Sequence, residues 1–399
     1  MVADFDYQKQ EFKLIKPHTS LVRGFEVFSF KEHVVSISSA ELMFYHGKVN
    51  EKVKLSGFVS ALFPFLKYRD LMLSDYLESI GARCSIDVSG SVTFLRIYAL
   101  STCFDDVITV VKECLFNAKL TIESFNHVKN LIIEEAKLQK KKKSIIQSKC
   151  MTRNIYSDAV LLSPDIDDVE EVDLQDVRSF FHKLKNSLGA VILLNTSEFC
   201  LDGFSNESKR SRFEVIRANK KIKLFPFIDR EQSVISQHLS FDLLPVQSYA
   251  KLYIFNQAFG GCFQSVLSQE IRERQGLTYG IGTSLNFGVT GVSFSLNSTT
   301  PYGQGELVLK EVHRLLSLLH EFVDVDYLED IKRLSIVSFL RNAEHVFSQI
   351  SLFKSLFLSK HPFDYYDDLF ELVKEQGIND VCSARDIVVN SPKLTIEVV

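Results

Sequence analysis

Two side chains that could stabilise negative charge, Arg272 and Tyr279, stand seven residues apart in the stretch QEIRERQGLTYGIGT, residues 269–283. A guanidinium binds a carbonyl or carboxylate oxygen through its rigid fork of N–H donors, and a phenol hydroxyl can donate to an oxyanion that forms during a reaction. The stretch predicts an amphipathic helix that ends at Gly276 and passes into a strand. The helix–strand junction would therefore present two hydrogen-bond donors.

The same two residues also have a purely structural interpretation. Arg272 could be a solvent-exposed helix residue, and Tyr279 could be a strand residue packed on the core. Gly276, Leu277 and the preceding Gly260–Gly261 turn favour the functional interpretation. These four residues are therefore predicted to bind substrate beside the arginine and the tyrosine.

The elements that would position this junction occur twice in the chain. Residues 73–100 and residues 267–296 each predict a short helix ended by a glycine and then two alternating, strand-like runs. Each half then continues with an apolar helix and closes on a helix and a final strand, at 190–195 and at 394–399. Such a pattern indicates an α+β fold with helices covering a largely antiparallel sheet. We expect two homologous lobes.

The predicted boundaries are an N-terminal lobe at 1–205, a linker at 206–225 and a C-terminal lobe at 226–399. The linker carries seven basic residues against two acidic ones and no strong apolar period, which is typical of an exposed connection. The alternative for this segment is an arm that binds nucleic acid. It is disfavoured because the segment has only two aromatic residues and no glycine.

Composition excludes several classes of protein. The formal net charge of −4 gives no overall attraction to nucleic acid or anionic lipid, and no uninterrupted apolar run is long enough to span a membrane. Seven scattered cysteines without a CxxC pair argue against a disulfide framework or a cysteine zinc site.

The N-terminal stretch has Asp4 and Asp6 and lacks an apolar run, unlike a signal or transit peptide. We expect a cytoplasmic location, with the periplasm or the mitochondrial matrix as alternatives if a presequence has been removed.

The duplicated halves and the stretch GGCFQSVLSQEIRERQGLTYGIGTSL, residues 260–285, resemble the insulinase and pitrilysin-like zinc metallopeptidase family. The resemblance is strongest to its short, mitochondrial-processing-peptidase-like branch. It implies that this chain is half of a clamshell, in which two double-lobed units face each other around a peptide chamber. In a catalytic unit the first lobe carries HxxEH on a helix, whose histidines bind Zn²⁺ while the glutamate activates water.

The chain departs from that metal motif. The matching helix, KLSGFVSALFPFLKYRD at 54–70, places Gly57, Ser60 and Ala61 where the family has His, Glu and His. None of the three can supply the required chemistry. In the family, a further glutamate later in the first lobe is the third zinc ligand. Glu134 and Glu135 stand near that position, but a lone carboxylate on a helix is expected to face solvent. We therefore expect no metal and no cofactor on this chain.

The resemblance assigns roles to the opening pair. Arg272 and Tyr279 match an arginine and a tyrosine that reach the peptide near the zinc, whereas Arg274 is out of register with that pattern. Some members of this branch divide the labour between an HxxEH subunit and a subunit that has lost the motif. We expect this chain to be the second kind: inactive alone, paired in a heterodimer with an HxxEH homologue that holds the zinc, and assisting peptide hydrolysis in trans. The peptide would add a strand to a sheet edge.

Two other functions stay open from sequence. The chain could be a non-catalytic scaffold subunit, as are the core proteins of the respiratory cytochrome complex in the same superfamily. It could also be a module that binds peptides without cleaving them. A scaffold has no need of an intact arginine–tyrosine signature, which favours the peptidase subunit.

Overall fold

The computed structural model describes residues 6–32, 36–51, 55–156, 161, 165–196, 199–211, 214–226 and 230–399. By its internal contacts the chain forms two compact units. The N-terminal unit comprises Lys16–Lys141 and Tyr156–Glu214. The C-terminal unit comprises Met1–Ile15, Lys142–Ile155 and Val215–Val399.

The N-terminal unit is built on a six-stranded sheet with the order β1-β2-β8-β3-β7-β6. Its strands are β1 (His18–Val22), β2 (Phe25–Phe30), β3 (Ile37–Phe44), β6 (Arg83–Val88), β7 (Thr93–Leu100) and β8 (Leu188–Leu194), with a separate small pair β4 (Lys67–Tyr68) and β5 (Leu71–Met72). Its helices are α1 (Ser56–Leu62), the short η3 (Phe63–Phe65), α2 (Leu73–Ser79), α3 (Phe104–Asn117), α4 (Ile122–Gln139), α6 (Ile166–Glu171) and α7 (Leu174–Lys185). Strand β8 is buried at every position, which explains its continuous apolar sequence.

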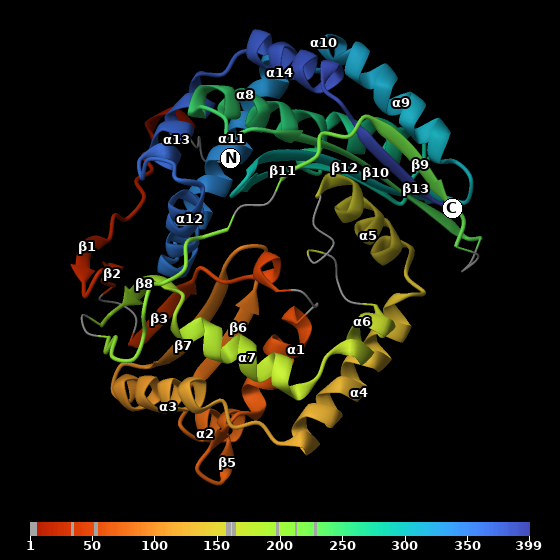
Figure 1. Ribbon diagram of the computed structural model, residues 1–399. Helices are drawn as coiled ribbons and strands as arrows, with labels where there is room; N and C mark the ends of the chain where they lie inside the picture. Colours follow the sequence, from red (N-terminus) through yellow and green to blue (C-terminus); the bar gives the residue numbers. More distant parts are fainter. Residues whose placement is uncertain are drawn as a thin grey trace. The chain divides into compact units, whose positions relative to one another are not determined.

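The C-terminal unit has a five-stranded sheet with the order β11-β12-β10-β13-β9. Its strands are β9 (Lys220–Leu224), β10 (Gln232–Phe241), β11 (Gly280–Gly288), β12 (Gly291–Pro301) and β13 (Leu394–Val398). Its longer helices are α5 (Lys143–Ile155), α8 (Val246–Asn256), α9 (Gly305–Ser317), α11 (Val325–Ala343), α12 (Val346–Ser359), α13 (Tyr365–Glu375) and α14 (Ile378–Asn390), and α10 (Leu319–Phe322) is a single turn. Within this unit α9 and α14 lie on one side of the sheet and α5 on the other (Figure 1).

The two sheets share one topology. The run β6-β7-β3-β8-β2 has the same pairing directions as β11-β12-β10-β13-β9: the last pair is parallel and the other three are antiparallel. The predicted α+β class, with largely antiparallel sheets covered by helices, is confirmed. The repeat seen in the sequence is therefore one sheet topology used twice.

The units are not continuous in sequence. Helix α5 precedes residue 205, yet it packs on the C-terminal sheet: Lys143 Nζ donates to Gln232 O at 2.5 Å and Gln147 Nε2 donates to Ile396 O at 3.5 Å. Residues 1–15 belong to the same C-terminal unit. The expected N-terminal lobe at 1–205 therefore does not coincide with one compact unit.

The linker predicted at 206–225 contains a strand, so its assignment as an exposed connection was wrong over Lys220–Leu224. This strand, β9, pairs in parallel with β13 at the edge of the sheet. Its sequence, KKIKL, alternates lysine with apolar residues. Lysines are common on edge strands because they discourage pairing with another chain, and the basic composition concealed the strand.

A partly buried imidazole makes stability depend on pH. His238 lies on the central strand β10, where its two ring nitrogens lie 3.0 Å from the hydroxyls of Ser295 and Ser240. Burial lowers the pKa of His238 from 6.5 to about 4. The unfolded chain therefore binds more protons than the folded chain between these two values, so the stabilisation present above pH 6.5 is lost as the pH falls.

We expect acidification from pH 7 to pH 5 to remove about 2 kcal/mol of unfolding free energy through His238 alone. Urea unfolding at the two pH values, compared between wild type and His238→Gln, measures this contribution. An equal pH dependence in both proteins would contradict the assignment.

Candidate functional site

The segment before β11 winds more widely than an α-helix. Helix α8 continues into the π-helix η5 (Gln257–Gly261), and after a short turn a second π-helix, η6 (Ser268–Arg274), follows. At its end the N–H of Gln275 donates to Glu270 O, five residues back, at 3.2 Å. Single π-turns are rare and occur often at functional sites.

Close packing against β11 and against the end of α8 explains the glycine pair of this segment. A Cβ on Gly260 would lie 2.7 Å from Thr283 Oγ1, and one on Gly261 would lie 2.6 Å from Asn256 Nδ2. Both positions therefore need glycine for the approach of η5 to its surroundings. Their predicted role in substrate binding stays a prediction, beside this packing role.

The predicted helix stop is confirmed at Gly276. Its φ is +62°, its N–H donates to Arg272 O at 3.2 Å, and the N–H of Leu277 donates to Ile271 O at 3.0 Å. These bonds complete a left-handed C-terminal cap. The carbonyl of Leu277 accepts from Thr300 Oγ1 at 2.8 Å, so the backbone of both residues serves the fold. Their contact with substrate stays a prediction.

Tyr279 does not pack on the core, so the structural alternative for this residue was wrong. Its N–H donates to Thr299 O at 2.9 Å, and Gly280 is the residue paired with Thr299 in the strand register. Tyr279 therefore lies immediately before β11, with its backbone held to the neighbouring strand β12. The side chain is a large exposed aromatic, with 63% of the residue accessible to solvent.

Arg272 is an exposed cation of the junction, and 42% of its side chain is accessible. Its Nε lies 3.6 Å from Glu273 Oε1, beyond a hydrogen bond. Arg274, by contrast, bonds Glu270 Oε1 at 2.7 Å. In the described part of the chain, the Arg272 guanidinium and the Tyr279 hydroxyl donate to no acceptor and are not bonded to each other. Both donors remain available to a ligand.

The three positions matched to the zinc motif share the less buried face of α1. Gly57, Ser60 and Ala61 are half-buried, while Phe58, Val59 and Leu62 on the opposite face are fully buried. The Phe58 ring stacks on Phe125 of α4 at 5.7 Å between centroids, so α1 and α4 pack together. No atom lies within 4 Å of a Cβ built on Gly57. The scaffold has room for a ligand, but the residues do not supply one.

The two glutamates of α4 face solvent, as expected. Glu134 pairs with Lys137 at 2.7 Å, and Glu135 accepts from Gln139 Nε2 at 2.8 Å. Among the described residues, no three His, Cys, Asp or Glu side chains gather in a way that could hold a metal ion. The residue set on α1 and α4 therefore does not fit zinc.

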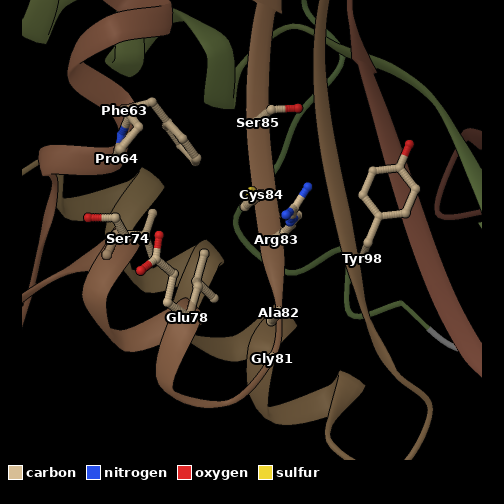
Figure 2. Close-up of a pocket in the computed structure, with 12 residues that line it drawn as sticks. Phe63, Pro64, Ser74, Glu78, Gly81, Ala82, Arg83, Cys84, Ser85 and Tyr98 are labelled. Carbon is tan, nitrogen blue, oxygen red and sulfur yellow. The ribbon is translucent and has the colours of Figure 1, made fainter.

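A cavity of about 830 Å³ lies in the N-terminal unit beside β6, the edge strand of its sheet. Figure 2 shows Phe63, Pro64, Ser74 and Glu78 on one side of it, with Arg83 and Ser85 of β6 across from them. Within the described chain, Glu78 and Arg83 form no ion pair, so a bound segment would meet both charges. The sequence reasoning did not find this cavity, because residues of η3, α2 and β6 line it together.

Sequence reasoning also missed Phe263, in the turn between the two π-helices. It is 65% exposed, and its ring centroid lies 5.5 Å from Arg272 Cζ. The only signal was a large apolar residue in the otherwise small and polar run GGCFQS.

Comparison with known proteins gives one family match. Residues 168–334 match the family described as "Peptidase M16 inactive domain". That segment includes η5, η6, Arg272 and Tyr279, but it spans less than half of the chain. A comparison with curated protein sequences finds no match.

Solved structures share the fold at low sequence identity. A peptidase M16 inactive domain from Pseudomonas fluorescens superposes with a TM-score of 0.81 at 16% identity, covering 96% of this chain and 98% of that one. The periplasmic protease PqqL from Escherichia coli gives 0.75 at 12% identity, covering 96% of this chain and 46% of that one. A chain of Complex III2 from Candida albicans gives 0.70 at 11% identity, covering 96% and 95%. The fold is that of M16-like proteins.

The search of the described helices finds none that is long and apolar enough to cross a membrane.

Proposed function

We propose that this chain is the metal-free subunit of a heterodimeric zinc metallopeptidase of the processing-peptidase type. One observation carries the proposal: Arg272 and Tyr279 are both exposed with unused donors, on a chain whose α1 offers no ligand for zinc. The match of residues 168–334 to the Peptidase M16 inactive domain supports the proposal.

The two side chains would act on a bound peptide in different ways. The Arg272 guanidinium can hold a backbone carbonyl or a carboxylate through two parallel N–H donors. The Tyr279 hydroxyl can donate to the oxyanion that develops when water attacks a peptide carbonyl. Neither role requires a metal on this chain. The zinc and the general base would belong to an HxxEH-bearing homologous subunit.

Each unit offers a place for an extended peptide. Strands β6 and β11 each lie at one edge of their sheet and are paired with one neighbour. An extended segment can add to such an edge through main-chain hydrogen bonds, which demand little of its sequence. The cavity beside β6 could receive one of its side chains.

The length of one similar protein supports the proposal of a second subunit. This chain spans about half of PqqL, so that protease is long enough to hold the present fold twice. We infer that the present chain obtains the second copy of the fold by associating with a homologous subunit. We place the complex in the cytoplasm.

A scaffold function is the second candidate, and the Complex III2 chain favours it because the fold covers 96% of one chain and 95% of the other. Under that function the exposed pair would have no role in hydrolysis.

The test is reconstitution with the HxxEH homologue from the same genome. We expect the dialysed chain alone to contain no stoichiometric zinc and to cleave none of a set of fluorogenic peptides. The mixture should form a complex, hold zinc on the partner and cleave peptides faster than the partner alone. One tightly held zinc per chain, or a stable complex without added activity, would reject the proposal.

A further inference from the structure

Phe263 is a large apolar side chain held out into solvent on a well-anchored turn. The turn links η5 and η6, and Tyr327 of α11 ties it down, since its hydroxyl lies 2.8 Å from Ala258 O and 3.2 Å from Gln264 O. Gln269 Nε2 donates to Phe263 O at 3.2 Å. The exposure of the ring therefore does not reflect a loose loop.

The ring lies under the Arg272 guanidinium, with Cζ 5.5 Å from its centroid. This distance is within the range of a cation–π contact, in which the cation is attracted to the negative face of an aromatic ring. The contact links a residue of the turn to a residue of η6 nine positions later. The wide π-turn and the anchored loop bring the two together.

An aromatic partner holds a guanidinium differently from a carboxylate. A phenylalanine ring carries no formal charge and no oxygen acceptor, so a cation–π contact neither neutralises the cation nor takes up the hydrogen bonds that it can donate to an oxygen atom. The neighbouring Arg274 is held by a carboxylate instead, since one of its terminal nitrogens lies 2.7 Å from Glu270 Oε1. The Phe263 contact thus restricts the Arg272 side chain while its N–H donors stay able to bond an oxygen atom of a substrate.

We propose that Phe263 is a positioning residue that pre-orients the Arg272 guanidinium for an oxygen atom of the peptide. The orienting contact stands on the geometry of the free chain. Its effect on hydrolysis rests on the proposed function.

The contact is tested on the free chain by NMR of the arginine side chains. Ring currents should shift the Arg272 δ and ε protons upfield, and Phe263→Leu should abolish this shift and increase the mobility of the Nε–H bond. Phe263→Trp should preserve both properties. Phe225→Leu is the matched control, since Phe225 is an exposed phenylalanine with Lys223 Nζ 5.8 Å from its centroid. Arg272 signals that are unshifted in the wild type, or unchanged by Phe263→Leu, would overturn the inference.

The kinetic effect is tested in the reconstituted pair. We expect Phe263→Leu to lower kcat/KM about threefold, Phe263→Trp to restore it, and Phe263→Leu to have no further effect in an Arg272→Ala background. An equal loss in that background would show that Phe263 acts independently of Arg272 and would overturn the positioning role. If Arg272→Ala itself leaves hydrolysis intact, the proposed function fails, and the NMR result decides the contact separately.

Discussion

Replacement of Tyr279 by phenylalanine is expected to lower the kcat of the reconstituted pair by about 10²–10³-fold, equivalent to about 2.7–4 kcal/mol of transition-state stabilisation. The substitution deletes only the hydroxyl. The Tyr279 side chain is exposed, and the hydrogen bond from Tyr279 to Thr299 O is donated by the backbone N–H. The fold and the strand register should therefore not change. KM should change little, since the hydroxyl is expected to act on charge that develops after binding.

Arg272→Ala should also lower turnover, and with a larger rise in KM, because a guanidinium that holds a carbonyl already does so in the bound substrate. Arg274→Ala is the matched control: it removes an exposed arginine two residues away that forms an ion pair with Glu270. Turnover, KM, subunit association and zinc content should be measured together, because a weakened complex would imitate a catalytic defect. Full activity in both Tyr279→Phe and Arg272→Ala would return the chain to the scaffold function.

The repeat could be predicted from the sequence because the strands of each sheet alternate apolar and polar residues in the same order along the chain. Alternating runs after a glycine-terminated helix indicated β6 with β7 and β11 with β12, and both pairs are present. Gly276 likewise marked the helix end correctly, since a positive φ favours glycine on local grounds. Features that depend on the chain's nearest neighbours in sequence could be predicted.

Features that depend on distant residues could not be predicted. Gly260 of η5 lies close to Thr283 of β11, and the backbone of Tyr279 bonds Thr299 of β12. The apolar face of helix α5 could pack on the sheet of either unit. The periodicity of its sequence therefore could not reveal which sheet it covers. The segment LTIEVV was predicted as the final strand, but its sequence did not show that Glu397 is fully buried.

Replacement of Lys223 by methionine is expected to destabilise the C-terminal unit by about 3 kcal/mol, because it would leave the Glu397 carboxylate buried without a cation. Glu397 has no accessible surface, and neither of its oxygens accepts a hydrogen bond from a described residue. Its cationic partner is Lys223, whose Nζ lies 3.2 Å from Oε2 and whose side chain is 34% exposed. Lys221→Met is the matched control, since Lys221 pairs on the surface with the exposed Glu306, and such pairs contribute little.

A double-substitution cycle separates the buried charge from the loss of packing. If the penalty comes from an unpaired carboxylate, Glu397→Leu should restore most of the stability lost in Lys223→Met, because an apolar pair replaces a broken ionic one. Urea unfolding of the four proteins measures the coupling. Additive losses would show that Lys223 and Glu397 contribute independently and would contradict the buried-pair account.

The same carboxylate explains why α9 begins with glycine. A Cβ on Gly305 would lie 2.3 Å from Glu397 Oε1, and the anion sits at the helix N-terminus, where the helix dipole favours negative charge. Gly305→Ala should therefore cost about 1–3 kcal/mol in the wild type through overpacking. In a Glu397→Ser background the clash is removed, and the cost should nearly disappear. An equal cost in both backgrounds would mean that Gly305 is required for a reason other than the approach of Glu397.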